Sequence, residues 1–211
     1  MMKKSYFETI SHLDLRKKIE EFLAKYGEKL QAKNYKINEV VRREGEKSQM
    51  IYIVKNGIFS ISKLENMESE TIIAFCRSLN FIVPVSALVP NFPTLYEIKS
   101  IENNLANPNS IYEIPIEQLN KIAEKDESLR GLLNAMLYDN LTTLLQLFEK
   151  FRLNRNIKNF ISDLYDAEHW ILNSGIPAHY IAEGFGMPLK SFRQILNDIK
   201  SKSRQKSAKK H

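Results

Sequence analysis

The sequence predicts an α+β protein with an N-terminal antiparallel β-roll of jelly-roll type, flanking helices, one long helix and a C-terminal helix-turn-helix. Three patterns lead to this prediction. Residues 30–114 alternate between apolar and polar side chains, residues 126–152 carry apolar side chains at helical spacing, and residues 177–197 hold two short helical patterns separated by Gly186. A period of two is typical of half-buried strands, and a period near 3.6 is typical of helices that bury one face.

Composition limits the classes of protein to consider. The 211 residues are 43% hydrophobic, which suffices for one large or two modest domains with proper cores. No apolar run approaches the roughly 18 residues of a membrane span, and the charged start MMKKSYFETISH does not resemble a signal peptide. We therefore expect a cytoplasmic protein that has no membrane partner. Cys76 is the single cysteine, which excludes an internal disulfide and an iron–sulfur cluster held by several cysteines of one chain.

The net charge is concentrated at the end of the chain. The last twelve residues hold six basic side chains and no acidic one, which leaves 31 − 6 = 25 basic against 25 acidic residues elsewhere. The six are Lys200, Lys202, Arg204, Lys206, Lys209 and Lys210. Such a run suits a nucleic-acid backbone, although a solubilising tail would have the same composition. With no apolar residue larger than Ala208, the tail is predicted to be disordered in the free protein.

An amphipathic helix is predicted at Leu13–Tyr26, ended by Gly27. Its apolar face consists of Leu15, Ile19, Phe22 and Leu23. Short strand-like segments follow in succession with no long helix between them, which predicts an antiparallel roll or barrel. Asn56-Gly57 lies between MIYIV and IFSIS and predicts a β-hairpin there.

The sequence contains no catalytic constellation. Metal-dependent enzymes on β-rolls need clustered His and carboxylate ligands, but all four histidines lie outside the strand region. They are His12, His169, His179 and His211. We found no nucleophile elbow, phosphate loop or zinc spacing. We therefore predict a protein that is not an enzyme and has no metal or cofactor.

A long helix is predicted at residues 126–153, and it carries two adjacent apolar stripes. The first comprises Leu129, Leu133, Met136, Asn140, Thr143 and Leu147. The second comprises Leu137, Leu141, Leu144, Phe148 and Phe151. Two stripes exceed what one partner surface requires, so we expect one to pack on the chain's own roll and the other on a second copy of the helix. Asn140 either fixes the register of a dimer or lies at the margin of an intramolecular face.

A hinge is predicted at residues 152–156, with Asn156 as N-cap of a helix over Ile157–Leu172. The helix-turn-helix follows, with Gly186 suited to a left-handed turn and Pro188 suited to the first turn of the second helix. The predicted domains are residues 1–125 for the N-terminal helix and roll, 126–153 for the long helix, 154–200 for the helix-turn-helix and 201–211 for the basic tail.

The second helix of the motif exposes polar side chains in its N-terminal half, which is the part that contacts bases when such a helix enters the major groove. These side chains are Lys190, Ser191, Arg193 and Gln194. An ordinary helical hairpin with a solvated polar face would show the same pattern. The pattern alone leaves both interpretations open.

The order of roll, long helix, hinge and helix-turn-helix resembles the Crp/Fnr family of bacterial transcription regulators over nearly the whole chain. NYKINEVVRREGEKSQMIYIVKNGIFSIS is similar to the family's strand, Gly-acid turn and hairpin, and ETIIAFCRSLNFIVPVSAL to the strands that lead to its effector pocket. LNRNIKNFISDL resembles the start of its DNA-binding domain and HYIAEGFGMPLKSFRQIL its helix-turn-helix.

The resemblance implies a homodimer that binds DNA, with RNA polymerase as a further candidate partner and a signal received by the roll. Lys190 and Gln194 match base-contacting positions, whereas His179 and Ser191 match backbone-contacting ones. Leu189 stands where many relatives carry a polar reader. The remaining candidates for DNA contact are Arg193, Lys200, Lys202 and Arg204. The long helix is expected to form the dimer contact, with the residues of the first stripe as candidates, but the sequence leaves open which stripe faces the partner.

Two departures from the family pattern bear on function. Val83-Pro84 and Tyr96-Glu97 stand where cyclic-nucleotide-binding members carry their ribose and phosphate ligands, and a carboxylate such as Glu97 repels a phosphate. We therefore expect the roll to receive a signal other than a cyclic nucleotide, with an unknown small-molecule effector, not cyclic AMP, as one candidate. Its candidate pocket comprises Cys76, Arg77, Val83, Pro84, Val85, Ser86 and Tyr96. The second departure is a basic tail in place of the family's two-stranded wing, so the wing is expected to be reduced or absent.

The leading interpretation is a dimeric, sequence-specific transcription regulator. The alternative is a β-roll module that binds a ligand or a protein and whose degenerate C-terminal domain no longer recognises specific DNA.

Overall fold

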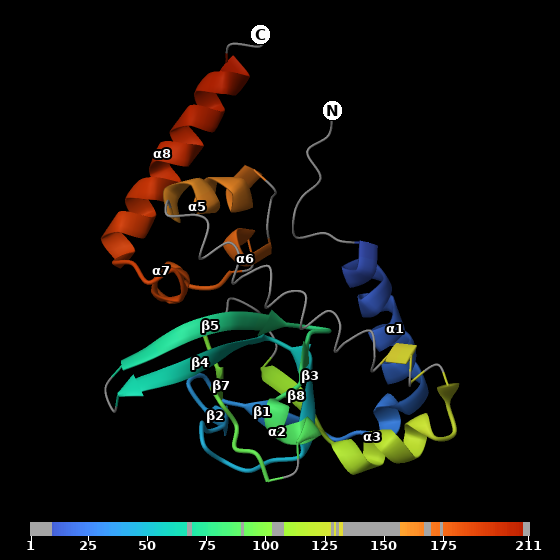
Figure 1. Ribbon diagram of the computed structural model, residues 1–211. Helices are drawn as coiled ribbons and strands as arrows, with labels where there is room; N and C mark the ends of the chain where they lie inside the picture. Colours follow the sequence, from blue (N-terminus) through green and yellow to red (C-terminus); the bar gives the residue numbers. More distant parts are fainter. Residues whose placement is uncertain are drawn as a thin grey trace.

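The two sheets of the β-roll lie between two layers of helices (Figure 1). The computed structural model describes residues 10–66, 69–89, 91–102, 108–127, 129, 131–132, 157–166, 170–173 and 175–208. In the described chain, one four-stranded antiparallel sheet has the order β1-β8-β3-β6 and the other β2-β7-β4-β5. The strands are β1 Ala32–Tyr35, β2 Val40–Arg42, β3 Met50–Asn56, β4 Ile58–Asn66, β5 Ser69–Arg77, β6 Phe81–Ile82, β7 Glu97–Ser100 and β8 Asn109–Pro115. The predicted fold class is confirmed.

The hairpin predicted at Asn56-Gly57 is wrong, because β3 and β4 belong to different sheets and do not pair with each other. Gly57 has a φ of +89°, and a Cβ atom there would lie 1.8 Å from Asn109 Oδ1. The Asn109 side-chain oxygen accepts a hydrogen bond from the Ile58 amide at 3.3 Å, and its nitrogen donates to the Ile101 carbonyl at 2.8 Å. Asn56-Gly57 is therefore a corner between the sheets, closed by Asn109. The hairpin of this region joins β4 to β5.

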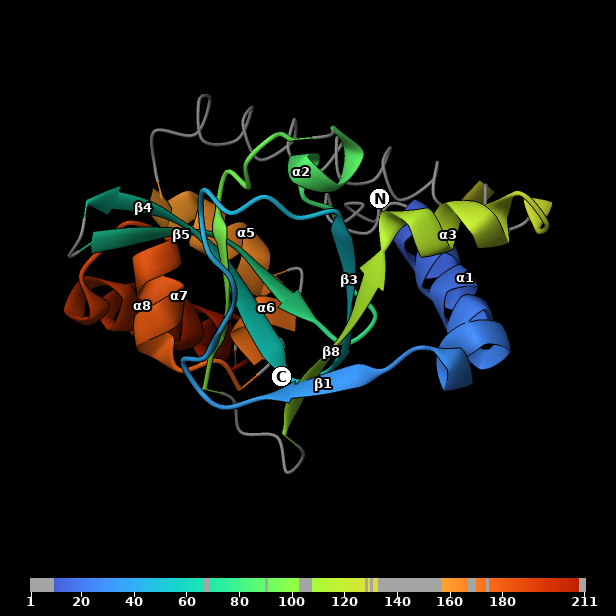
Figure 2. The ribbon, with the colours of Figure 1, turned by 90° about the horizontal axis from the view of Figure 1, so that it is seen from below.

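The first helical layer covers the outer face of the β1-β8-β3-β6 sheet (Figure 2). It consists of α1 at Ile10–Tyr26, the short 3-10 helix η1 at Gly27–Lys29, and α3 at Ile116–Ala123. The sequence had assigned no element to α3. Ile19 and Phe22 are buried, as the amphipathic pattern predicted. They belong to what we name the helix-side cluster: Ile19, Phe22, Leu30, Ile51, Ile53, Ala87, Tyr112, Ile114, Leu119, Leu129 and Leu132.

The beginning of the predicted long helix is anchored to α1. Asp126 accepts hydrogen bonds from Lys25 Nζ at 2.6 Å and from the Tyr26 hydroxyl at 2.7 Å. Residues 127, 129, 131 and 132 are helical, and Leu129 and Leu132 are buried in the helix-side cluster. Residues 133–156 lie outside the described residues, so the predicted hinge and the rest of both stripes lie there too.

Between the sheets lies a second core, which we name the inter-sheet cluster: Tyr52, Val54, Phe59, Cys76, Ile82, Ile98 and Ile111. Partly buried side chains pack against it, among them Tyr35, Met50 and Tyr96. The alternation along the strands explains this arrangement, since neighbouring residues such as Ile51 and Tyr52 face opposite sides of their sheet. Burial raises the pKa of the Cys76 thiol to about 12.

The second helical layer consists of α5 at Ile157–Asp166, α6 at Trp170–Asn173, α7 at Ala178–Gly184 and α8 at Leu189–Ala208. The sequence had predicted one helix over Ile157–Leu172, whereas the structure describes two, with residues 167–169 outside the description. The short α2 at Val85–Leu88 follows β6 in the roll. The prediction of a disordered tail is wrong as far as Ala208, because α8 continues to that residue. No Gly or Pro interrupts residues 189–208, and Ile199 in mid-helix is buried.

We expect Gly57→Ala to destabilise the protein by about 2 to 4 kcal/mol, from left-handed backbone strain and displacement of Asn109. Urea unfolding measures the loss. Gly186→Ala is the matched control: Gly186 has a φ of +62°, but no atom lies within 4 Å of the position that a Cβ atom would take there. It should cost only the strain, about 1 to 2 kcal/mol. Equal losses in the two variants would show that the contact with Asn109 has no energetic role.

Cys76 should resist alkylation in the folded protein. A thiol whose pKa is raised to about 12 holds almost no thiolate at pH 8, and only the thiolate attacks iodoacetamide. In 8 M urea the thiol regains its ordinary pKa and should react rapidly. Mass spectrometry at timed intervals measures both rates. Labelling of the folded protein as fast as that of the unfolded chain would contradict the burial of Cys76.

Candidate nucleic-acid interface and effector region

The helix-turn-helix is formed by α7, a turn at residues 185–188 and α8. The turn is closed by backbone hydrogen bonds from Gly186 to the Glu183 carbonyl at 2.8 Å and from Met187 to the Ala182 carbonyl at 3.0 Å. Gly186 has a positive φ of 62°, as the turn prediction required. Pro188 lies just before α8 and accepts a hydrogen bond from the Phe192 amide at 3.1 Å. The predicted motif is therefore confirmed.

A shared core holds the two helices of the motif against α5. Phe192 is fully buried, and its ring centroid lies 6.0 Å from that of Phe185. Phe185 in turn contacts Phe160 of α5, with ring centroids 5.8 Å apart. We name this core the domain cluster: Ile58, Ile101, Ile161, Ile176, Ile181, Ala182, Phe192 and Ile199. It includes Ile58 and Ile101 of the roll, so the core of the motif is continuous with the β-roll.

The predicted DNA-contacting side chains lie on the surface. Lys190, Ser191, Arg193 and Gln194 are exposed on α8, whereas Phe192 and Ile199 of the same helix are buried. His179 is exposed on α7, with its ring centroid 4.1 Å from that of Tyr180. Lys200 is exposed as well. Lys202 and Arg204 belong to α8, but the structure does not describe their side chains. The motif therefore presents one polar, basic helical face.

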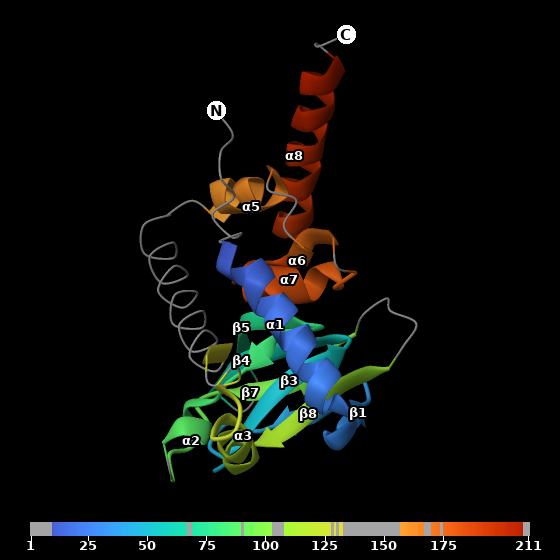
Figure 3. The same cartoon turned by 90° about the vertical axis from the view of Figure 1, so that its right-hand side faces the viewer.

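The motif is docked on the outer face of the β2-β7-β4-β5 sheet through α7 (Figure 3). A Cβ atom on Gly184 would lie 3.3 Å from the Phe75 ring and 3.7 Å from Ile72, both on β5. The Tyr180 hydroxyl donates a hydrogen bond to Asn38 Oδ1 at 3.0 Å. The contact therefore pairs an apolar centre with a polar edge.

Charged groups surround this docking contact. Lys99 of β7 forms an ion pair with Glu70 of β5 across the small, fully buried Ser60 and Ser62 of β4. The Ser62 hydroxyl donates to Glu70 Oε2 at 3.1 Å. On α7, burial raises the pKa of Glu183; Glu70 raises it further, and Lys99 opposes the shift. The sequence offered no signal for this cluster, because its members come from three strands and a helix.

The candidate effector residues do not converge on one point. Cys76 and Tyr96 lie together in the inter-sheet cluster, whereas Val83 packs on the helix-side cluster. Burial and the nearby Arg16 of α1 lower the pKa of Arg77, which places Arg77 toward α1. Pro84 and Ser86 are buried, and the Val85 side chain lies outside the description.

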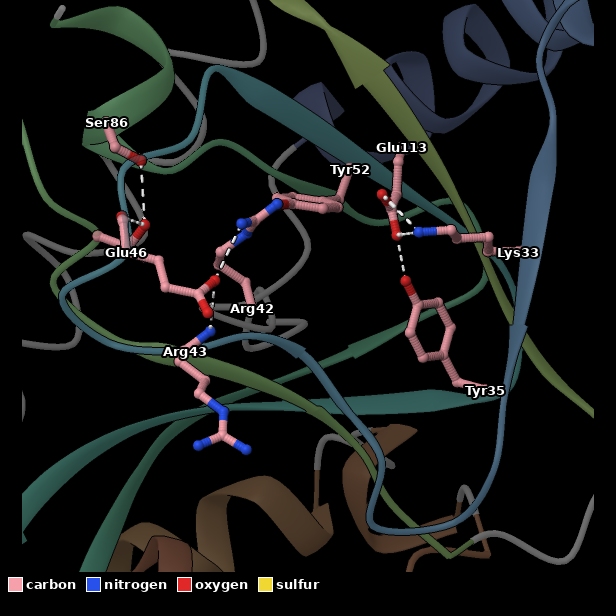
Figure 4. Close-up of polar contacts among 9 residues, drawn as sticks. Lys33, Tyr35, Arg42, Arg43, Glu46, Tyr52, Ser86 and Glu113 are labelled. Carbon is pink, nitrogen blue, oxygen red and sulfur yellow. Dashed lines mark hydrogen bonds and ion pairs between the residues drawn. The ribbon is translucent and has the colours of Figure 1, made fainter. Parts of the chain in front are cut away.

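A polar network that the sequence did not predict runs through this region (Figure 4). Ser86 of α2 and Thr94 share a hydrogen bond at 3.2 Å, and the Thr94 hydroxyl donates to the Glu46 carbonyl at 2.8 Å. Glu46 accepts a bond from Arg42 Nη1 at 2.9 Å, and Arg42 Nε donates to the Tyr52 hydroxyl at 3.0 Å. The network thus links β2 and β3 to α2.

No group of three or more His, Cys, Asp or Glu side chains in the described part of the chain is placed to hold a metal ion. Within the same residues, no helix combines the length and apolar character needed to cross a membrane.

The comparisons with known proteins rest on structure. No protein-family model and no curated protein matches the sequence. FixK2 from Bradyrhizobium japonicum matches with a TM-score of 0.65 at 16% identity, over 82% of this chain and 86% of that one.

Two further solved structures agree. CLP, a c-di-GMP responsive global regulator from Xanthomonas campestris, matches with a TM-score of 0.62 at 16% identity, over 89% of this chain and 92% of CLP. A putative Crp/Fnr family transcriptional regulator from Eubacterium rectale matches with a TM-score of 0.57 at 13% identity, over 89% and 83% of the two chains. The chain therefore has the fold of these proteins.

Proposed function

We propose that the chain is a cytoplasmic, sequence-specific DNA-binding transcription regulator of the Crp/Fnr family that works as a homodimer. The observation that carries the proposal is the exposed polar face of α8, held outward by the buried Phe192 and Ile199 on its opposite side. A helix-turn-helix presents its second helix to the major groove in this way. Binding of DNA accounts for the polar face of α8 and requires no catalytic group.

The roles of the exposed side chains follow from their positions. Lys190 and Gln194 lie four residues apart on α8, so they project from the same face and can reach neighbouring base pairs. We assign base reading to these two. Phosphate contacts fall to His179, Ser191, Arg193 and Lys200, and to Lys202 and Arg204 farther along the helix.

Dimer formation is assigned to the segment after Leu132. Leu129, the first residue of the first stripe, is buried in its own subunit together with Leu132. The remaining stripe residues, Leu133 to Leu147, and the adjacent stripe from Leu137 to Phe151 supply two more apolar surfaces. One of the two suffices to pair two copies through parallel helices.

The signal received by the roll is proposed to be other than a cyclic nucleotide. Tyr96 packs on the inter-sheet cluster, and burial raises the pKa of the adjacent Glu97, which lies near Lys99 and Glu70. Neither side chain offers the cation or cluster of amide donors that a cyclic phosphate requires.

Selection of genomic fragments by the purified protein tests the proposal. We expect enrichment of one two-fold symmetric site, because a homodimer presents two identical recognition helices. Recovery of fragments without a shared sequence would favour the alternative, a β-roll module whose C-terminal domain no longer recognises specific DNA.

Lys190→Ala and Gln194→Ala should each weaken binding to the selected site by about 1 to 3 kcal/mol and relax the preference at particular base pairs. Binding titrations on the site and on variants of each base pair measure this effect. Lys63→Ala, which removes an exposed cation from β4, is the control and should leave the base preference unchanged. Equal losses on specific and random DNA would refute the assignment of the two residues as base readers.

Cyclic AMP and cyclic GMP should neither raise the melting temperature nor change the affinity for DNA. A ligand at a hundred times its dissociation constant stabilises the folded state by about 2.7 kcal/mol, which thermal melting detects readily. A nucleotide-dependent rise in melting temperature would refute this part of the proposal.

A further inference from the structure

Arg42 is a cation on the inner side of the roll with few partners. Its side chain is 22% exposed, and Nε donates to the hydroxyl of Tyr52, a residue that is fully buried. Nη1 donates to Glu46 (Figure 4). In the described part of the chain, Nη2 has no hydrogen-bond acceptor. A guanidinium group can hold a carboxylate through two parallel N–H···O bonds. In Arg42, Nη1 is bonded to Glu46 and Nη2 is left to form a second bond of this kind.

The hydroxyl protons of two further residues of the roll also lack acceptors among the described residues. The Tyr52 hydroxyl accepts a bond from Arg42, but within the described chain its own proton has no acceptor. Tyr52 and Tyr96 interact electrostatically, and both pack in the inter-sheet cluster. Ser48, two residues before β3, holds a buried hydroxyl with no partner in the same set of residues. Among these atoms, only the Ser48 hydroxyl is buried without a partner in the described chain. The unused Nη2 of Arg42 and the Tyr52 proton suit a ligand that brings acceptor atoms.

The one carboxylate on Arg42 among the described residues belongs to a surface turn. The Glu46 side chain is 44% exposed, and an exposed ion pair of this kind contributes little to stability. A ligand carboxylate can therefore replace it at small cost. The other inner carboxylate, Glu113, is already held by Lys33 and Tyr35.

The charge balance favours one carboxylate over a phosphate. Arg42 is the cation of this network, and the neighbouring Arg43 guanidinium points away from it (Figure 4). A phosphate monoester, with close to two negative charges, would keep one of them uncompensated in this setting.

Displacement of the Glu46 side chain by a ligand can affect residues outside the site. The Glu46 carbonyl accepts bonds from the Thr94 amide at 2.9 Å and the Thr94 hydroxyl at 2.8 Å. Thr94 bonds to Ser86 of α2, and the next residue, Ala87, packs in the helix-side cluster with Leu129 and Leu132. A shift of the turn at residues 43–46 therefore reaches the beginning of the long helix.

We propose that Arg42 anchors a binding site for a small organic monocarboxylate inside the roll, with Tyr52 and Tyr96 as further donors and Glu46 as the internal group that the ligand displaces. The ligand's effect on DNA binding rests on the proposed function, whereas the binding itself does not. The site differs from the candidate pocket in its anchor, since Arg42 lies on β2, outside that set.

The first test uses the full chain with acetate, benzoate and phenylacetate, each against its neutral amide. At millimolar concentrations, at least one acid should raise the melting temperature and bind in calorimetry, and its amide should not. Absence of binding by all three acids, or equal binding of an acid and its amide, would overturn the proposal.

Variants locate the site. R42Q should weaken binding of the acid at least about tenfold, because a charge-assisted pair is lost. R43Q, which removes the adjacent exposed arginine, should leave the affinity unchanged. E46Q should tighten binding by about two- to fivefold, since it removes a weak internal competitor. Weaker or unchanged binding in E46Q would overturn the proposal even if R42Q failed to fold.

Binding to the genomic fragments, measured with and without the acid, separates the two proposals. An acid that binds through Arg42 while the protein selects no sequence would refute the proposed function and leave the Arg42 site intact. A protein that selects a palindrome but binds none of the acids would refute the Arg42 site alone.

Discussion

The docking of α7 on the outer face of the β2-β7-β4-β5 sheet is the contact on which the arrangement of the molecule depends. A sheet that faces the inter-sheet cluster on one side must either expose its other side to water or cover it. Here Ile58 and Ile101 of the roll join Ile181 and Phe192 in one buried cluster, so the helix-turn-helix and the roll share apolar surface. Burial of that surface holds α7 and α8 at a defined place on the roll.

The same sheet carries polar residues where a wholly apolar surface would bind more tightly. Ser60 and Ser62 are fully buried, and their small size leaves room for the ion pair between Lys99 and Glu70 above β4. The Tyr180 hydroxyl bonds to Asn38 at the edge of this region. A contact made partly of hydrogen bonds and charges is more specific in geometry than an apolar one, and it separates at lower cost because water can replace the polar partners.

Two sets of contacts therefore extend outward from the roll. One is the direct contact through α7. The other runs from the turn at residues 43–46 through Thr94 and α2 to Leu129 and Leu132, where the long helix begins. Because packed interiors have low compressibility, a displacement on either side of the roll is passed to the residues packed against it.

Periodicity and turn chemistry by themselves determined most of the elements and their order, although not α3 or the division between α5 and α6. The face of α1 with Ile19 and Phe22, most of the strands, the Gly186 turn and the exposed residues of α8 all follow from local spacing. Tertiary structure decided what depends on partners distant in the sequence. Asn56-Gly57 has the composition of a hairpin, but Asn109 makes it a corner between sheets. The position of Arg42 as a candidate ligand anchor depends on its hydrogen bonds to Tyr52 and Glu46. Local sequence specifies backbone angles and amphipathic faces, whereas the contacts between faces are settled by packing of the whole chain.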